Sequence, residues 1–276
     1  MEQNHRGLEA SVSHPRQVLC MKWGTLYGPE YVNRLYASVR RQVSGPLRFV
    51  CLTDDANGIR EEVETHPCPE IAIPEPWRNT TWRKMALYLE PSALANLEGD
   101  WLFLDLDVVI TGRLDPLFEY APDHPFVVMQ NWTQRGKGIG NTSVFRFRMN
   151  THGYLLERLL EDFPGYLERD RNEQTYISRE INSLQFWPDA WCVLFKVHCV
   201  PAWPLRLWRT PAIPEGARVV AFPGSPNPPD ALQGKWPEKR WRKRLYKKIQ
   251  PASWIETYWT RSEELLAKET GEKAEA

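Results

Sequence analysis

Apolar and polar residues alternate in blocks along the first part of the chain, in an order that predicts strands and helices following one another. An apolar run at 17–23 predicts a strand, and a second run at 47–52 predicts another. Between them, residues 30–42 repeat apolar side chains at helical spacing, and the pair Gly45-Pro46 would end the helix. A strand–helix–strand unit predicts two parallel strands with a right-handed crossover, and therefore an α/β fold.

The longest apolar run, at 101–110, is interrupted only by Asp105 and Asp107. A run of this length is typical of a strand buried on both faces, where carboxylates two residues apart would point the same way. Because ionised carboxylates are costly to bury without a partner, either the chain leaves the sheet at 104–105 or a metal ion binds there. Mn²⁺ or Mg²⁺ holding a diphosphate fits such oxygen ligands. The simpler alternative is that both residues end a strand and bind backbone amides of the next turn.

The remaining pattern gives further elements and a domain outline. Strands are predicted at 63–67, 126–130, 141–148 and 218–222, and helical segments at 82–89, 92–97, 152–160 and 171–181. Beyond residue 187 Pro and Trp dominate, which predicts an irregular, aromatic-rich part. We expect a loose leader at 1–15, one domain at 16–232 and a basic, aromatic C-terminal extension at 233–276, of which 265–276 would fray.

Composition narrows the class of protein. The 276 residues suffice for one large α/β domain or two small ones, and a formal net charge of +0 gives no support for nucleic-acid binding. The count of Cys is odd and no C-x-x-C pair occurs, which argues against structural zinc and a disulfide framework and for a reducing compartment. Residues 1–14 lack an apolar signal region and no apolar run could span a membrane, so we expect a cytoplasmic protein.

Seven short motifs occur along the chain in the order of one protein family. They are Lys22–Tyr31, Leu52–Asp55, Trp82–Met85, Phe103–Ile110, Gly140–Ser143, Glu173–Gln174 and Phe222–Pro228. On these motifs the chain resembles nucleotide-sugar glycosyltransferases of the GT-A fold, nearest to glycogenin-like and bacterial lipopolysaccharide galactosyl- or glucosyltransferase-like members. The resemblance implies a Rossmann-like α/β fold with a mixed, mostly parallel sheet flanked by helices.

The resemblance also implies roles for individual residues. Asp107 would be the principal ligand of Mn²⁺ or Mg²⁺, and Asp105 would contact both the metal and the ribose. Glu173 and Gln174 would lie near the anomeric carbon on the acceptor side. The residues expected to bind the donor are Lys22, Trp23, Gly24, Thr25, Tyr27, Asp54, Lys84, Asp105 and Asn141.

One position departs from the family pattern. Family members often have a His metal ligand in the loop after the last core strand, where this chain reads Phe222-Pro223-Gly224. Pro223 has no side-chain donor. Either two aspartates suffice together with phosphate oxygens and water, or another residue such as His198 substitutes.

The implied reaction moves a hexose from a nucleoside-diphosphate sugar, with a UDP-sugar as the expected donor, to a hydroxyl of a saccharide or glycolipid. A divalent cation and Lys84 would stabilise the departing diphosphate. The family favours retention, whereas inversion would need a carboxylate base, for which Glu173 and Asp189 are candidates. The alternatives are a non-catalytic carbohydrate- or nucleotide-binding protein and a sugar-nucleotide nucleotidyltransferase, which would want a basic, Gly-rich loop that 24–28 does not provide.

Basic residues alternate with Trp, Leu and Tyr from 235 to 248. This pattern is typical of an interfacial anchor on anionic lipid, although a solvated basic helix would also show it. If the acceptor is lipid-linked, we expect peripheral contact with the inner face of the plasma membrane. No nucleic-acid partner is expected, because the rest of the chain adds no basic surface.

Overall fold

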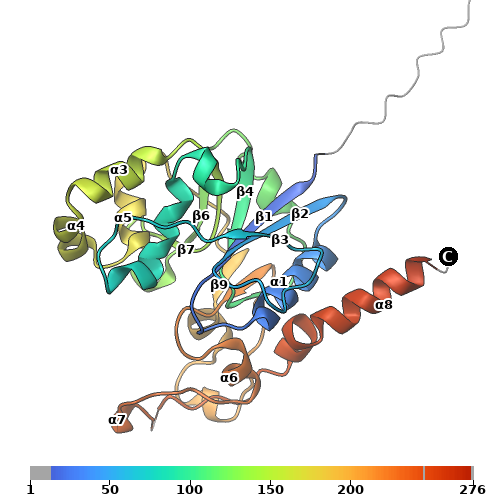
Figure 1. The fold of residues 1–276 in the computed structure, drawn as a ribbon. Coiled ribbons are helices and arrows are strands. Elements are labelled where there is room, and N and C mark those ends of the chain that lie inside the picture. Colours follow the sequence, from blue (N-terminus) through green and yellow to red (C-terminus); the bar gives the residue numbers. More distant parts are fainter. Residues whose placement is uncertain (1–13, 245, 275–276) are drawn as a thin grey trace, which may run out of the picture.

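The computed structural model describes residues 14–244 and 246–274, so nearly all of the leader expected at 1–15 lies outside the described residues (Figure 1). The strands are β1 (Arg16–Lys22), β2 (Leu47–Thr53), β3 (Glu64–Pro67), β4 (Asp100–Leu104), β5 (Val108–Ile110), β6 (Phe126–Gln130), β7 (Gly140–Arg148), β8 (Gln185–Phe186), β9 (Cys192–Leu194) and β10 (Val219–Ala221). The α-helices are α1 (Pro29–Gln42), α2 (Asp115–Glu119), α3 (Gly153–Glu161), α4 (Phe163–Asp170), α5 (Glu173–Glu180), α6 (Pro228–Leu232), α7 (Trp241–Arg244) and α8 (Ser262–Ala274). Tighter or wider helical segments are η1 (Trp77–Asn79), η2 (Thr81–Tyr88), η3 (Pro91–Leu94), η4 (Trp132–Gln134), η5 (Phe195–Cys199), η6 (Leu205–Leu207) and η7 (Glu256–Thr260).

The large sheet has seven strands in the order β3-β2-β1-β4-β7-β6-β8. All neighbouring pairs are parallel except those made by β7, which runs antiparallel to β4 and β6. A mixed, mostly parallel sheet flanked by helices is the fold class predicted from the sequence, and it is confirmed. β5, β10 and β9 form a second, three-stranded sheet.

The central apolar run forms two strands rather than one. β4 ends at Leu104 and β5 begins at Val108 in the other sheet, so the chain leaves the large sheet at Asp105. On β4, Trp101 and Phe103 pack on one side of the sheet and Leu102 and Leu104 on the other, all of them fully buried. The expectation of a strand buried on both faces is therefore confirmed for 101–104, and both aspartates lie in the connection between the two sheets.

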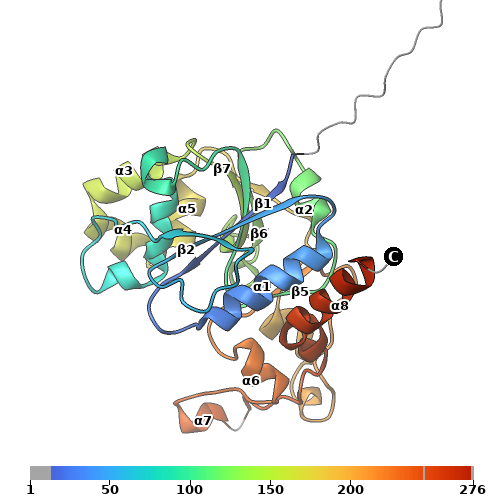
Figure 2. The ribbon, with the colours of Figure 1, turned by 45° about the vertical axis from the view of Figure 1, so that its right-hand side comes forward.

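Helices cover the two faces of the large sheet separately (Figures 1 and 2). On one face η2, α3, α4 and α5 contribute to a core cluster with Trp82, Leu155 and Tyr176. On the other face α1 packs with the three-stranded sheet and with the C-terminal part of the chain. The sequence pattern did not predict α4, and the helix that it predicted at 82–89 is the tight helix η2.

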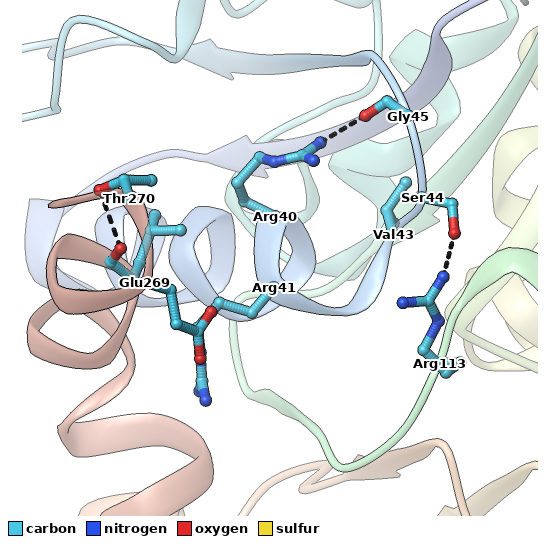
Figure 3. Close-up of a pocket in the computed structure, with 9 residues that line it drawn as sticks. Arg40, Arg41, Val43, Ser44, Gly45, Arg113, Glu269 and Thr270 are labelled. Atoms are coloured by element: carbon cyan, nitrogen blue, oxygen red, sulfur yellow. Dashed lines mark hydrogen bonds and ion pairs between the residues drawn. The ribbon is translucent and has the colours of Figure 1, made fainter. Parts of the chain in front are cut away.

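The expectation of a frayed end at 265–276 is wrong for most of that range, because α8 extends to Ala274 and packs along α1 (Figure 2). Leu266 is 6% exposed, and Arg41 Nε donates to Glu269 Oε1 at 2.8 Å. A pocket of about 280 Å³ lies at this junction (Figure 3). Its arginines already have partners, because Arg40 binds the Gly45 carbonyl and Arg113 binds Ser44.

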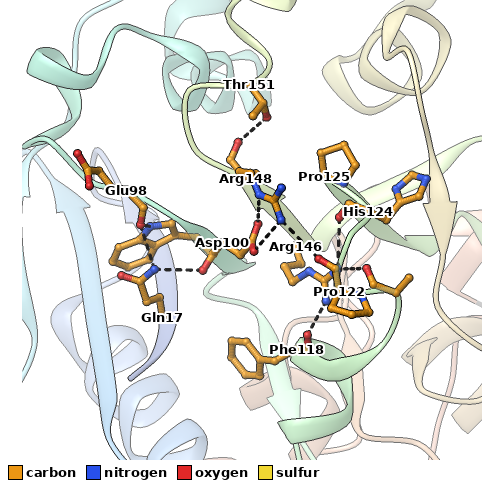
Figure 4. A network of polar contacts seen from close by, with 12 residues as sticks. Gln17, Glu98, Asp100, Phe118, Pro122, His124, Pro125, Arg146, Arg148 and Thr151 are labelled. Carbon is orange, nitrogen blue, oxygen red and sulfur yellow. Dashed lines mark hydrogen bonds and ion pairs between the residues drawn. The ribbon is translucent and has the colours of Figure 1, made fainter. Parts of the chain in front are cut away.

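A buried arginine on β7, inside the large sheet, binds the connection between α2 and β6 (Figure 4). Arg146 on β7 is 2% exposed, and its guanidinium donates to five backbone carbonyls. They belong to Leu117, Phe118, Tyr120, Ala121 and His124. Burial lowers the pKa of Arg146. Because one buried guanidinium donates to five carbonyls of the same connection, it fixes residues 117–124 against the sheet.

Candidate active site

A cavity of about 740 Å³ lies where β1 and β4 end. The carboxyl ends of parallel strands are where open α/β sheets bind ligands. The loop after β1, the connection after β4 and the first residues of α5 all contribute to its wall. Many of the residues singled out in the sequence line it together: Trp23, Gly24, Thr25, Tyr27, Lys84, Asp105, Asp107, Glu173 and Gln174.

Lys84 places an ammonium between the acidic residues of this cavity. Its Nζ lies 2.7 Å from Oδ1 and 2.8 Å from Oδ2 of Asp105, and it donates to the Thr142 carbonyl at 3.0 Å. Burial acts to lower the pKa of Lys84, but the carboxylates of Asp105 and Glu173 outweigh burial and raise the pKa. Lys84 is therefore a cation at neutral pH, held inside the cavity beside the carboxylates of Asp105 and Glu173.

The helix η2 explains why Lys84 and not its neighbour faces the cavity. Thr80 caps η2 by accepting a hydrogen bond from the Trp82 amide, and Trp82 is buried against Phe163 and Tyr176. Arg83 points elsewhere, with its Nε 3.4 Å from the Sγ of Cys68. Packing of Trp82 thus fixes the rotation of η2 and directs Lys84 toward Asp105.

Glu173 extends the acidic group from the other side. It is 3% exposed, its Oε1 accepts a hydrogen bond from Thr142 Oγ1 at 2.9 Å, and the same oxygen lies 4.0 Å from Lys84 Nζ. Asn172 caps α5 by accepting from the Thr175 amide, which places Glu173 in the first turn of the helix. The Glu173 carboxylate is therefore held in place by its neighbours.

Asp107 is a buried carboxylate of the cavity whose side-chain partner is a hydroxyl rather than a cation. It is 8% exposed, and Oδ2 accepts a hydrogen bond from the Tyr27 hydroxyl at 3.1 Å. Burial, reinforced by the charge of Asp105, raises the pKa of Asp107 to about 7. Burial and the Asp107 carboxylate likewise raise the pKa of Tyr27, which keeps the Tyr27 proton on the shared hydrogen bond.

These two carboxylates fit a hard divalent cation in donor type and in charge. A cation next to Asp107 would offset both the burial and the repulsion from Asp105 that raise its pKa. Among residues 14–244 and 246–274, no third His, Cys, Asp or Glu joins them to form a larger ligand group. His198, the substitute considered from the sequence, lies against Trp132 with its Nδ1 3.1 Å from the Leu194 amide nitrogen. Water and substrate oxygens would then complete the coordination, as is common for Mg²⁺.

Four other residues expected at the site do not line the cavity. Asp54 Oδ2 accepts a hydrogen bond from the Gly24 amide at 2.8 Å, and Asn141 Oδ1 accepts one from the Ser143 amide at 2.9 Å. Lys22 donates to the Asp55 carbonyl at 3.1 Å. Asp54 and Asn141 therefore position backbone that does line the cavity. Asp189 is exposed in the loop between β8 and β9.

Several polar residues of the cavity wall had no assigned role in the sequence analysis. The clearest are Asn79, Thr80, Thr81 and Asn172. Thr80 and Asn172 are helix caps, and Asn just before a helix that starts with Glu is a pattern that sequence can reveal. Thr80 and Asn172 lie at the same cavity because η2 packs against α5, and a local sequence pattern does not show that packing.

No family model matches the sequence, and a search of curated proteins finds no match. Solved structures do match in shape. The galactosyltransferase LgtC, in complex with donor and acceptor sugar analogs, matches with a TM-score of 0.53 and 13% identity over 77% of this chain and 88% of LgtC. The glycosyltransferase GlyE of Streptococcus pneumoniae matches with a TM-score of 0.54 and 16% identity over 89% of this chain and 64% of GlyE. Mouse xyloside xylosyltransferase 1 matches with a TM-score of 0.50 and 10% identity over 76% of this chain and 98% of that protein.

Proposed function

We propose that this chain, which has the GT-A glycosyltransferase fold, transfers a hexose from a nucleoside-diphosphate sugar to a hydroxyl of a saccharide or glycolipid. A UDP-sugar is the expected donor. The observation that carries the proposal is the meeting of Lys84, Asp105 and Asp107 in one cavity at the carboxyl ends of β1 and β4. At these sequence identities the structural matches show the fold, and the glycogenin-like subfamily remains a prediction.

The main barrier to the reaction is the negative charge that develops on the leaving diphosphate. Lys84 is preorganised for that charge, because it is buried, protonated and held by Asp105 and the Thr142 carbonyl. Asp105 and Asp107 would hold Mn²⁺ or Mg²⁺, which supplies Lewis-acid stabilisation of the same oxygens when bound. The loop of Trp23, Gly24 and Thr25 would hold the nucleotide against the end of β1.

Retention of configuration is the outcome that we propose. The carboxylates lining the cavity are Asp105, Asp107 and Glu173. The first two would be occupied with the metal and Lys84, and Glu173 already accepts from Thr142 beside Lys84. Asp189, the other base considered, is not part of the wall. A free base on the acceptor side is thus missing from the described residues, which favours a mechanism that needs none, with Gln174 beside the reacting sugar.

Release of nucleotide from candidate donors tests the proposal. We expect UDP to be released from UDP-glucose or UDP-galactose in the presence of Mn²⁺, and release to stop when a chelator is added. GDP-mannose serves as the comparison donor. Pyrophosphate formation from UTP and a sugar phosphate would instead indicate a nucleotidyltransferase. Binding of UDP without turnover of any donor, at any acceptor tried, would indicate a non-catalytic binding protein.

We also propose contact with an anionic membrane through a surface in the C-terminal part of the chain. Aromatic side chains are unusually exposed there, including Trp208 at 72% and Trp241 at 67%. A neighbouring groove of about 800 Å³ brings together basic side chains from segments far apart in the sequence. They are Arg206, Lys235, Lys239, Lys247 and Lys248. Exposed Trp beside clustered Lys and Arg matches the interface of an anionic bilayer in both polarity and charge. In the described part of the chain, no helix is both long and apolar enough to cross a bilayer.

Vesicle sedimentation tests this contact. A variant with Lys239, Arg240, Arg242 and Lys248 all changed to Gln should bind vesicles containing phosphatidylglycerol at least about a hundredfold more weakly than wild type, at about 1 kcal/mol per basic residue. The matched control changes Arg135, Lys137, Arg158 and Arg171 to Gln and should sediment like wild type. Equal sedimentation of the two variants would reject the membrane surface.

A further inference from the structure

The three-stranded sheet brings three separate segments to one edge. β10 pairs antiparallel with β5, with Ala221 opposite Val108, and parallel with β9, with Ala221 opposite Leu194. The start of β5 therefore meets the ends of β9 and β10. Because of this register, Asp107 just before β5, Pro223 just after β10 and Lys196 just after β9 lie at the same edge.

Lys196 is held at this edge by the packing of its neighbour. Phe195 and Phe222 are both fully buried, and their rings stack with centroids 4.5 Å apart. The phenylalanine pair ties the end of β9 to the end of β10 and fixes the backbone from which Lys196 projects. Lys196 is the second residue of η5 (Phe195–Cys199), which begins directly after β9.

The ammonium of Lys196 lies against the wall of the cavity. Nζ donates to the carbonyl of Pro223 at 2.5 Å, and Pro223 and Gly224 both line the cavity. Gly224 has a φ of +71°, and a Cβ built on it would lie 4.0 Å from Lys196 Nζ. Lys196 itself does not line the cavity, and Pro223 and Gly224 are the residues through which its ammonium adjoins the wall.

Lys196 has no carboxylate within 4.0 Å among the residues that the structure describes, and its side chain is only partly exposed. Burial, together with the charge of Lys247, lowers the pKa of Lys196, while Asp107 acts in the opposite direction. An ammonium without a carboxylate partner beside an acidic cavity is an arrangement that an anionic ligand would complete.

We propose that Lys196 binds the diphosphate of the donor, from the three-stranded sheet, as a second ammonium besides Lys84. In reaching the diphosphate, Nζ would exchange the Pro223 carbonyl for a phosphate oxygen. The inference rests on the proposed function. It offers a reason why the loop after β10 can lack a side-chain metal ligand at Pro223: a fixed cation stands next to it and shares the work of neutralising the leaving group.

The competing role for Lys196 is a clamp that only holds the Pro223 carbonyl. Two variants separate the roles. Lys196→Gln removes the charge but keeps a hydrogen-bond donor for the carbonyl, and Lys196→Arg keeps the charge. The matched control is Lys248→Met, which removes an exposed ammonium elsewhere.

Binding of UDP and of uridine, measured by ligand-observed NMR with Mn²⁺ replaced by Mg²⁺, decides between them. We expect Lys196→Gln to weaken UDP binding about tenfold to a hundredfold and to leave uridine unchanged, since uridine lacks the diphosphate. Lys196→Arg should retain most of the UDP affinity. Unchanged UDP affinity in Lys196→Gln, or an equal loss for UDP and uridine, would overturn this inference and leave the proposed function standing. Failure of wild type to bind UDP would overturn the proposed donor site and this inference with it.

Discussion

Changing Asp107 to Asn is expected to lower kcat/KM for sugar transfer by about a thousandfold, because the amide removes the principal anionic ligand of the proposed cation. In a thermal-shift assay, the Mn²⁺-dependent part of the stabilisation by UDP should disappear. The matched control is Asp123→Asn, an exposed carboxylate in a distant loop, which should behave like wild type.

The same variant should not be less stable than wild type. The usual pKa of Asp is 3.8, and burial and Asp105 raise that of Asp107 to about 7. A carboxylate whose pKa is raised in the folded state costs stability as the pH rises from about 4 to about 7, since the unfolded chain gives up its proton first. In chelator, urea unfolding of wild type should therefore show this loss, and Asp107→Asn should show less of it.

In the thermal-shift assay, a metal-dependent stabilisation by UDP that survives in Asp107→Asn would count against the site.

Changing Lys84 to Met is expected to remove both transfer and a large part of the stability. The change leaves Asp105 and Glu173 without their shared cation, and Lys84 and Glu173 side chains are each only 4% exposed. Loss of one partner from a buried ion pair costs about 3–5 kcal/mol, which urea unfolding measures. Transfer should fall at least about a hundredfold in material that is still folded.

A neighbouring residue provides the control for Lys84. Arg83 is buried on the same helix but faces Cys68 rather than the cavity. Arg83→Met should therefore lower stability without weakening UDP binding per folded molecule. The double change Lys84→Met with Glu173→Gln should recover part of the lost stability, because it removes one of the stranded carboxylates. If Lys84→Met unfolds at wild-type urea concentrations, the buried ion pair does not have the role assigned to it.

Much of the fold followed from apolar periodicity, and the exceptions have physical causes. Runs such as 17–23 and 47–52 are buried on both faces, so they carry a strong strand pattern. The split between β4 and β5 was left open because a buried strand and a chain changing sheets look alike in sequence. α4 was missed because Pro164 and Gly165 suggest a loop, whereas Asp162 accepts a hydrogen bond from the Gly165 amide and caps the helix. α8 has a weak apolar pattern and depends on packing against α1.

The candidate site shows the same division. Asp105 and Asp107 stood out because acidic residues interrupt an apolar run, and Lys84 because a family motif contains it. Their convergence with Glu173 depends on contacts between η2, β7 and α5. Lys196 ends the run 189–196, which the sequence suggested as a wall for the acceptor and not as a neighbour of Pro223. Its place beside Pro223 depends on the pairing of β9 with β10, which join segments well apart along the chain.

Diffraction from crystals grown with UDP and MnCl₂, with data collected at the manganese absorption edge, tests the central claim most directly. The account predicts one anomalous peak in the cavity, within bonding distance of the Asp107 carboxylate and of both phosphates of UDP, with the uridine on the Trp23–Thr25 loop. UDP bound in the cavity with no manganese at Asp107, or UDP bound elsewhere on the molecule, would contradict it.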